Sequence, residues 1–283
     1  MAQWNKNTQE YLPHGTSLFE VVMIADEDGN PLNSYGSAAN IPIAAGQLAG
    51  YSSIEKFGRN PNVTGSIETI WEHGGIYQYL TTASQIFVYS ASSNDGVGQT
   101  GAIKVTVQGL DENWNIISEE LTVNGAGSTA TFLRAYRAFI TDAGSDGYNR
   151  GDLIISTQAS GAGTVLADIG GDGTGSNFIG YGQTMLALYT VPAGKTAYLT
   201  QWTIGNGNYN TSCSAFLRTR LPFNGFVMTT SDTMAVSGGF HVKNYSIPLK
   251  FVEKTDIEVQ AFNGGGTTIS STFNVILVDN PTP

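Results

Sequence analysis

From about Ile70 to the end of the chain, hydrophobic and polar residues alternate with a period of two in several stretches. The alternation is clearest at residues 103–108, 257–261 and 273–277, where every second side chain is aliphatic or aromatic. This period is typical of strands with one buried face, whereas no window carries the 3.6-residue period and the caps of a long helix. The pattern therefore predicts an all-β protein.

Candidate strands recur roughly every 8 to 12 residues, a spacing typical of sandwiches and jelly rolls. They lie at residues 85–91, 103–107, 116–123, 132–140, 153–156, 164–167, 184–191, 196–204, 214–220, 225–230, 240–245, 248–251, 257–261 and 273–277. The glycine-rich stretch GGDGTGSN at 170–177 is predicted to be a linker or a long loop. We therefore expect two antiparallel, jelly-roll-like β-sandwich domains, at residues 61–178 and 179–283, behind an extended N-terminal arm at residues 1–60.

The expected arm is weakly patterned and contains many small residues, so it cannot bury much surface by itself. Residues 19–25 (FEVVMIA) form one short strand candidate, and the Asp28-Gly29 pair after it predicts a hairpin-like turn. Trp4 is a large ring without a local core, which predicts that it docks into a pocket of a partner. Tyr11 and Phe19 are further candidate interaction residues of the arm.

The chain carries little charge, and that charge is acidic. Charged residues make up 13% of the sequence, against roughly 25% in an average soluble protein. The formal net charge is −10, which argues against binding nucleic acid or an anionic membrane. The first residues lack the apolar core of a secretory signal, so we expect assembly in a cytoplasm. The single cysteine, Cys213, is interpreted as a core residue.

Candidate catalytic residues are sparse. His14, His73 and His241 lie far apart and show neither HxH nor HExxH spacing, which disfavours a zinc site or a Ser-His-Asp triad. Glu119 and Glu120 are adjacent on a predicted strand and should point to opposite faces, unlike the paired carboxylates of a retaining glycosidase. We expect the protein not to be an enzyme and to use no cofactor.

Two short motifs resemble ligand loops without matching them. Residues 26, 28 and 30 match the first oxygen ligands of a calcium loop, but Pro31 and Ser37 occupy later key positions, which excludes an EF-hand. A looser calcium site there, or at residues 168–172, stays open. The AGKT stretch at 193–196 resembles the end of a phosphate-binding loop, but Tyr189 stands where the first glycine is required, and we interpret the stretch as a hairpin turn.

Several aromatic residues could form a carbohydrate-binding platform, although in β-sandwiches such residues more often serve as core or interface anchors. These residues are Trp71, Tyr77, Tyr79, Trp114, Trp202 and Tyr209.

Three blocks of the sequence resemble virion structural proteins of tailed bacteriophages. They are YSSIEKFGRNPNV with IETIWEHGGIYQYLTTA at 51–83, IFVYSASSNDGVGQTGAIKVTVQGLDENWNIISEELTVNG at 86–125, and VPAGKTAYLTQWTIGN at 191–206. The resemblance implies jelly-roll-like domains in homo-oligomers, often trimers, and it supplies no catalytic residue.

The resemblance suggests a capsid decoration (cement) protein in the virion, bound to the major capsid protein or to other virion proteins. The alternatives are a head fibre, a spike or a tail or neck component that contacts the host surface. A third possibility, from another class, is a carbohydrate-binding module or a glycan hydrolase.

Overall fold

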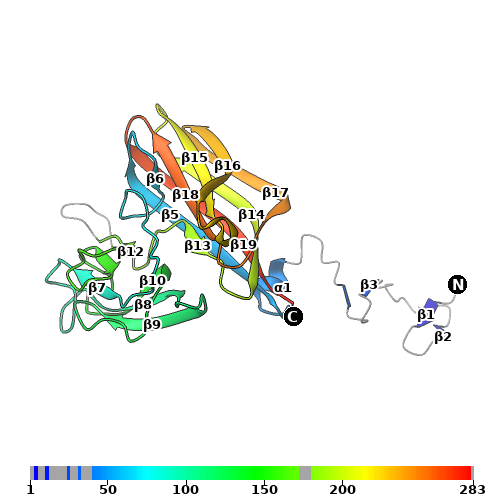
Figure 1. The fold of residues 1–283 in the computed structure, drawn as a ribbon, viewed down its shortest axis with the longest axis horizontal. Coiled ribbons are helices and arrows are strands. Elements are labelled where there is room, and N and C mark those ends of the chain that lie inside the picture. Colours follow the sequence, from blue (N-terminus) through cyan, green and yellow to red (C-terminus); the bar gives the residue numbers. More distant parts are fainter. Residues whose placement is uncertain are drawn as a thin grey trace. The chain divides into compact units, whose positions relative to one another are not determined.

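The computed structural model describes residues 3–5, 10–12, 24–25, 31–32, 40–171 and 180–281. The chain divides into two compact units, residues 1–48 and residues 49–283. The described part is almost entirely β-structure in antiparallel sheets, as the alternating pattern predicts (Figure 1). The all-β fold class is therefore confirmed, and the sheets are compatible with a sandwich arrangement.

The first unit contains two short antiparallel strand pairs. Its described elements are β1 (Gln3–Asn5), β2 (Glu10–Leu12), β3 (Ile24–Ala25), β4 (Pro31–Leu32) and the helix α1 (Asn40–Ala44). β1 pairs with β2, and β3 pairs with β4. The hairpin-like turn expected at the Asp28-Gly29 pair lies outside the described residues. Only the last two residues of the strand expected at 19–25 are described as a strand.

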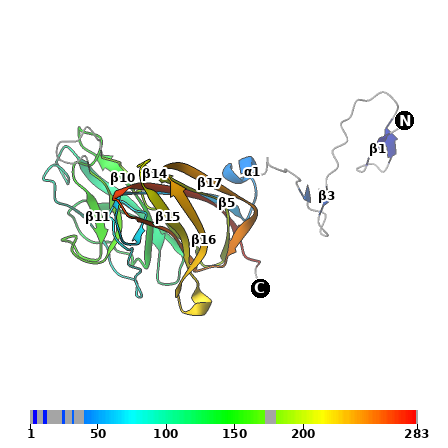
Figure 2. The same ribbon diagram turned by 90° about the horizontal axis from the view of Figure 1, so that it is seen from above.

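The second unit holds two bodies of β-structure, which we call the first and second sandwich (Figures 1 and 2). The first sandwich has sheets of strand order β10-β8-β9 and β12-β11-β7. Its strands are β7 (Phe87–Ser90), β8 (Ala102–Leu110), β9 (Ile116–Thr122), β10 (Arg134–Ala143), β11 (Leu153–Ser156) and β12 (Val165–Ile169).

The second sandwich has sheets of strand order β17-β14-β19-β5 and β13-β18-β15-β16, with β6 paired to β18. Its elements are β5 (Tyr51–Val63), β6 (Glu68–Thr69), β13 (Leu188–Thr190), β14 (Lys195–Asn206), β15 (Ser212–Arg220), the 3-10 helix η2 (Pro222–Asn224), β16 (Met228–Ser237), β17 (Gly239–Phe251), β18 (Asp256–Asn263) and β19 (Thr267–Asp279).

The first sandwich is an insertion within the second. β5 and β6 precede it in the chain, yet β5 pairs along its length with β19, and β6 pairs with β18. Residues 51–60, which we expected in the arm, therefore lie in a sheet of the second sandwich. The two sandwiches are accordingly not consecutive segments divided near residue 178.

Each sandwich has its own apolar core. The first is built around side chains such as Val105, Phe132 and Ile155. The second centres on Trp202 and Phe273, and it also takes in residues of the first sandwich and of the connecting segments, including Leu110, Tyr136 and Trp71. The second core therefore extends across the boundary between the sandwiches.

The structure differs in detail from one strand prediction and one turn prediction. The strands expected at 240–245 and 248–251 are one strand, β17, which lies at the edge of its sheet, where Pro248 is tolerated. The stretch 193–196 is a turn with Gly194 at φ 72°, but it does not close a hairpin. It joins β13, which pairs with β18, to β14, which pairs with β17 and β19, so it carries the chain from one sheet to the other.

Candidate functional site

The most extensive buried polar cluster among the described residues joins the first sandwich to the second. We call it the junction cluster, and its side chains are Tyr79, Arg134, Thr190, Arg220, Asp256 and Glu258. Arg134 begins β10 of the first sandwich, whereas Asp256 begins β18 of the second. Tyr79 lies on the segment that leads from β6 to β7.

Arg134 and Asp256 form a bidentate ion pair that is almost completely shielded from solvent. Arg134 Nε donates to Asp256 Oδ1 at 2.8 Å, and Arg134 Nη2 donates to Oδ2 at 3.1 Å. Arg134 Nη1 donates to the carbonyl oxygens of Leu80 and Leu133. The side chains are 3% and 0% exposed, so the geometry supplies the paired charge-assisted bonds that a buried ion pair requires.

Two further donors complete the environment of the Asp256 carboxylate. Arg220 Nη1 donates to Oδ2 at 2.9 Å, and Thr190 Oγ1 donates to Oδ1 at 2.7 Å. The carboxylate thus accepts hydrogen bonds from β10, β13 and β15 at once. One side chain therefore connects three strands and both sandwiches.

Aromatic rings cover the two guanidinium groups. The Arg134 guanidinium lies 4.9 Å from the ring centroids of both Tyr79 and Trp114, and Arg220 lies 4.3 Å from that of Tyr79. Trp114, in the turn between β8 and β9, stacks on Phe226 of the second sandwich with centroids 5.6 Å apart. Trp114 adopts φ 66°, a costly conformation for a bulky residue, and contacts across the junction offset that cost.

Glu258 is the group of the junction cluster whose pKa resembles that of a general acid or base. Burial raises the pKa of Glu258 to about 7, and the neighbouring Asp256 adds to the shift. Its carboxyl accepts a hydrogen bond from Tyr79 Oη at 2.7 Å and another from Gln260 Nε2. With both oxygens bonded within the protein and the residue 1% exposed, Glu258 is placed for a structural role, not for contact with a substrate.

His73 is the histidine with a charged partner in the described structure. Its Nδ1 lies 3.0 Å from Asp168 Oδ2, and this hydrogen bond raises the pKa of His73. Burial raises the pKa of Asp168. Asp172, the far end of the looser calcium site considered above, lies outside the described residues, as do residues 26–30. Among the described residues, no three His, Cys, Asp or Glu side chains are grouped so that they could hold a metal ion.

The predicted interaction residues lie in the first unit. The backbones of Trp4 and Tyr11 pair with each other across β1 and β2. Phe19 lies outside the described residues. A role for Trp4, Tyr11 and Phe19 in binding a partner stays a prediction.

The other candidate residues occupy structural positions. Glu119 accepts hydrogen bonds from the amides of Thr129 and Ala130, whereas Glu120 pairs with Lys104, so the two adjacent carboxylates bind different partners. Cys213 is buried, as expected for a core residue, and burial raises the pKa of its thiol to about 11.

The aromatic residues considered as a carbohydrate platform do not share a surface. Trp71, Tyr77 and Trp202 are buried, whereas Tyr209 is 83% exposed. Tyr79 and Trp114 cover the guanidinium groups of the junction cluster. The set therefore serves mainly as core and junction anchors, the alternative that is more common in β-sandwiches.

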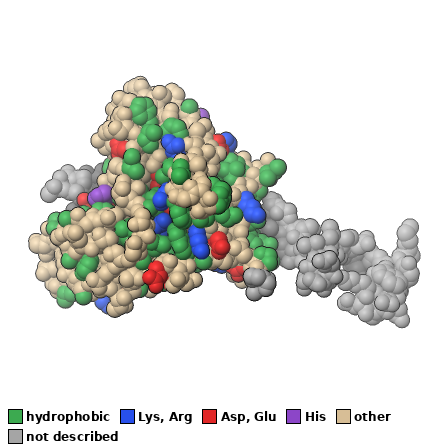
Figure 3. Space-filling model, in the orientation of Figure 1, with side chains coloured by type: hydrophobic (Ala, Val, Ile, Leu, Met, Phe, Trp, Pro, Cys, Tyr) green, Lys and Arg blue, Asp and Glu red, His purple; other side chains and the backbone are tan. Residues whose placement is uncertain are grey.

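Sequence reasoning missed an exposed apolar row on the edge strand β17. Phe240 and Val242, which are two residues apart and so lie on one face of the strand, are exposed there, and we call them the β17 row. On the face drawn in Figure 3, charged side chains are sparse among hydrophobic, polar and backbone atoms. The described residues include no helix long and apolar enough to cross a membrane.

Comparisons with known proteins give distant structural matches only. No family model and no curated protein matches the chain. Structures of the Gx and Gt strains of infectious bursal disease virus each align at 8% identity and a TM-score of 0.20, covering 81% and 82% of this chain and 71% and 73% of theirs. A crystal structure of the VP2 subviral particle of the same virus aligns at 10% identity and a TM-score of 0.17, covering 82% of this chain and 73% of that one. Similarity at this level carries no argument about function.

Proposed function

We propose that the protein is a non-enzymatic structural component of a virion, most specifically a decoration (cement) protein that binds a bacteriophage capsid and stabilises it. The observation that carries the proposal is the junction cluster, which holds two β-sandwiches in one fixed arrangement through a buried, fully bonded carboxylate. A protein that makes the same contacts many times on a lattice requires such a fixed arrangement. The sequence blocks that resemble phage virion proteins supply the link to a virion.

The chain offers two regions for attachment to partners. The β17 row presents apolar side chains on a strand that has a free edge, and such edges pair readily with other chains. The N-terminal unit, with Trp4 and Tyr11, is the second region. We assign these regions to contacts with the major capsid protein or other virion proteins and to self-association, with a trimer as the expected oligomer.

The test is capsid stability with and without the protein. A ligand that binds the assembled shell and not its dissociated subunits stabilises the shell by mass action. Particles that lack the chain should release their genome at a lower temperature, and adding back the purified protein should restore the original temperature. An unchanged release temperature would contradict a cementing role.

Deletion of residues 1–48 tests the attachment role of the first unit. Because β5 begins at Tyr51, the truncated protein keeps every strand of both sandwiches and should stay folded. It should nevertheless fail to bind particles. The milder Trp4→Ala should weaken binding about ten-fold or more if the ring fills a pocket, which corresponds to roughly 1–3 kcal/mol.

A fibre, spike or tail or neck component is the alternative within the same class, because a rigid two-sandwich body would serve there as well. The copy number per particle separates the two functions. Hundreds of copies would support decoration of the lattice, whereas a few to some tens would support a vertex or tail location.

A further inference from the structure

A cavity of about 300 Å³ lies where β5 of the second sandwich faces β8 and β10 of the first. Two cationic side chains line it, Lys56 from β5 and Arg137 from β10. The side-chain amides of Gln108 and Gln183 add hydrogen-bond donors, and Ile54 and Tyr189 add apolar surface. The lining thus combines positive charge, neutral donors and hydrocarbon.

Lys56 is unusual for a lysine because it is only 7% exposed. Its Nζ donates a hydrogen bond to the carbonyl oxygen of Tyr136 and lies 5.9 Å from the centroid of the Tyr136 ring. An ammonium group has three donors, so one carbonyl satisfies a minor part of its capacity. Burial and, to a smaller extent, the nearby positive charge of Arg137 lower the pKa of Lys56 to about 7.

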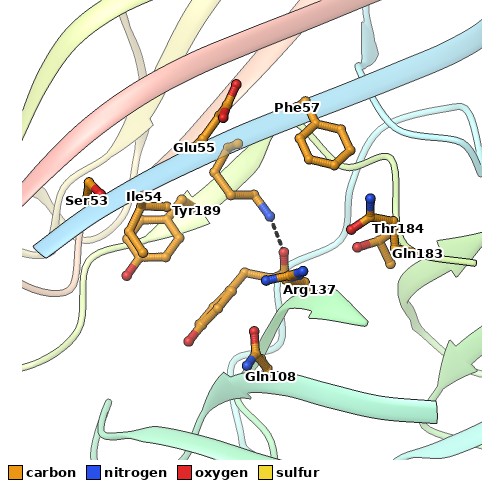
Figure 4. A pocket seen from close by; sticks show the side chains of 11 residues that line it. Ser53, Ile54, Glu55, Phe57, Gln108, Arg137, Gln183, Thr184 and Tyr189 are labelled. Carbon is orange, nitrogen blue, oxygen red and sulfur yellow. Dashed lines mark hydrogen bonds between the residues drawn. The ribbon is translucent and has the colours of Figure 1, made fainter. Parts of the chain in front are cut away.

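The charged groups around the cavity do not neutralise these two cations. Among the described residues, neither Lys56 nor Arg137 forms a salt bridge, and the Arg137 guanidinium lies 4.9 Å from the ring of Phe139. Glu55 is the acidic residue of the lining. Neighbouring residues of a strand point to opposite faces, and Figure 4 shows the Glu55 carboxylate across β5 from Arg137. The other titratable groups, Tyr136 and Tyr189, stay neutral because burial raises their pKa values.

We propose that this cavity binds a carboxylate carried on a short apolar stem, with Lys56 and Arg137 as the binding residues. A guanidinium group matches a carboxylate in a bidentate geometry, and an ammonium group adds a point charge. Ile54 and Tyr189 suit a hydrocarbon stem better than the fully polar surface of a phosphate. Two sources supply such a carboxylate: a free small acid, or a glutamate side chain of a neighbouring protein. This binding goes beyond the structural function proposed above.

Binding should depend on pH in a defined direction. A bound carboxylate stabilises the ammonium form of Lys56, so binding is coupled to proton uptake when Lys56 is neutral beforehand. With a free-protein pKa of about 7, affinity should fall as the pH rises above 7. We expect binding to be roughly ten-fold weaker at about pH 8.5 than at about pH 6. The Arg137 guanidinium accounts for the affinity that remains.

The experiment is a calorimetric titration of the full chain at constant ionic strength with three probes. Glutarate represents a free acid, a peptide with blocked termini and one glutamate represents a partner side chain, and inorganic phosphate tests the preference for a carboxylate. The same peptide with glutamine in place of glutamate is the control. Saturable binding of either carboxylate probe supports the proposal, and the probe that binds more tightly identifies the source.

Three variants assign the binding to the cavity. Lys56→Met should weaken it at least ten-fold and remove its dependence on pH, and Arg137→Gln, a change at an exposed residue, should also weaken it at least ten-fold. Lys250→Met removes an exposed lysine of β17 and should change nothing. The proposal is overturned if neither carboxylate probe binds at about 10 mM, weaker than ordinary specific binding, if phosphate binds as tightly as the better carboxylate probe, or if Arg137→Gln binds like the wild type.

Discussion

Two groups of charged side chains lie between the sandwiches, and their charges are arranged in opposite ways. In the junction cluster, Asp256 is bonded to Arg134, Arg220 and Thr190, so its negative charge is neutralised within the protein. In the cavity, Lys56 is bonded to a backbone carbonyl and faces a second cation, Arg137. The first region is complete in itself, whereas the second keeps an excess of positive charge.

The difference separates structural charge from charge available for binding. A buried ion pair in which every carboxylate oxygen is hydrogen-bonded fixes the relative positions of the strands that carry it. Removing one partner lowers the free energy of unfolding, because the other charge is then buried alone. An unneutralised ammonium group in a cavity gains interaction energy when an anion arrives. Four predictions test this contrast, beginning with the largest effect.

Asp256→Ala should be the most destabilising of the four changes. It leaves Arg134 buried beside Tyr79 without a counter-charge, and the loss in free energy of unfolding should be about 3–5 kcal/mol. Urea unfolding monitored by tryptophan fluorescence measures it. Glu120→Gln is the matched control, because it breaks the exposed ion pair with Lys104 and should have little effect. Similar losses in both variants would mean that the junction cluster is no more important than a surface pair.

Gly58→Ala should destabilise through steric overlap at the strand that we did not expect in the sheet. A Cβ at Gly58 would lie 2.3 Å from the backbone nitrogen of Ala187 and 2.4 Å from the carbonyl oxygen of Ile70. Both are backbone atoms that cannot rotate away, so a loss of about 1–3 kcal/mol is expected. Gly65→Ala is the control, since nothing lies within 4 Å of a Cβ there. An unchanged midpoint for Gly58→Ala would contradict the close approach of β5 to the connecting segments.

Some strands of the fold could be predicted from the sequence, and others could not. Strands with one buried face, such as β8, β18 and β19, follow from the alternation because burial imposes a period of two. The hydrophobic pattern of β5 does not alternate, because polar residues occupy two of its buried positions. Lys56 bonds to Tyr136 of the first sandwich, and Asn60 bonds to Glu68 and Thr69 of β6.

The contacts within the junction cluster could not be predicted from the sequence either. Arg134 and Asp256 are 122 residues apart, and no local pattern reports on so distant a contact. Lys56 lies in a segment that we expected to be part of the arm, and nothing in the local sequence indicates that the fold buries this lysine.

Glu258→Gln should change how the stability of the protein depends on pH. The pKa of Glu258 is raised in the folded state from 4.5 to about 7, so the folded protein binds the proton more tightly than the unfolded chain does. Its contribution to stability is therefore fully present below about pH 4.5 and is lost as the pH rises to about 7. Stability should fall by up to about 1.4 kcal/mol per pH unit in this window. The free energy of unfolding, measured between about pH 4 and pH 8, should not show this fall in the variant. If it falls equally in the variant and the wild type, the assignment to Glu258 is contradicted.

Lys56→Met should change stability in the opposite direction from Asp256→Ala: it should stabilise the folded protein. Because burial lowers the pKa of Lys56 from 10.5 to about 7 in the folded state, its contribution to stability is present above about pH 10.5 and is lost as the pH falls to about 7. Below that pH the folded protein carries a buried ammonium without a carboxylate, and a methionine of similar length removes that cost. The variant should therefore be more stable than the wild type at about pH 6, and the gain should shrink as the pH rises.

The sign of this change sharpens the contrast with Asp256→Ala. Both variants remove a buried charged group. Only the loss of the Asp256 carboxylate, which has ionic partners, should lower the free energy of unfolding. Lys250→Met controls for loss of a lysine charge at the surface. A large loss of stability in Lys56→Met would mean that its bond to the Tyr136 carbonyl satisfies the ammonium fully. The cavity would then be a second structural junction and not a binding site.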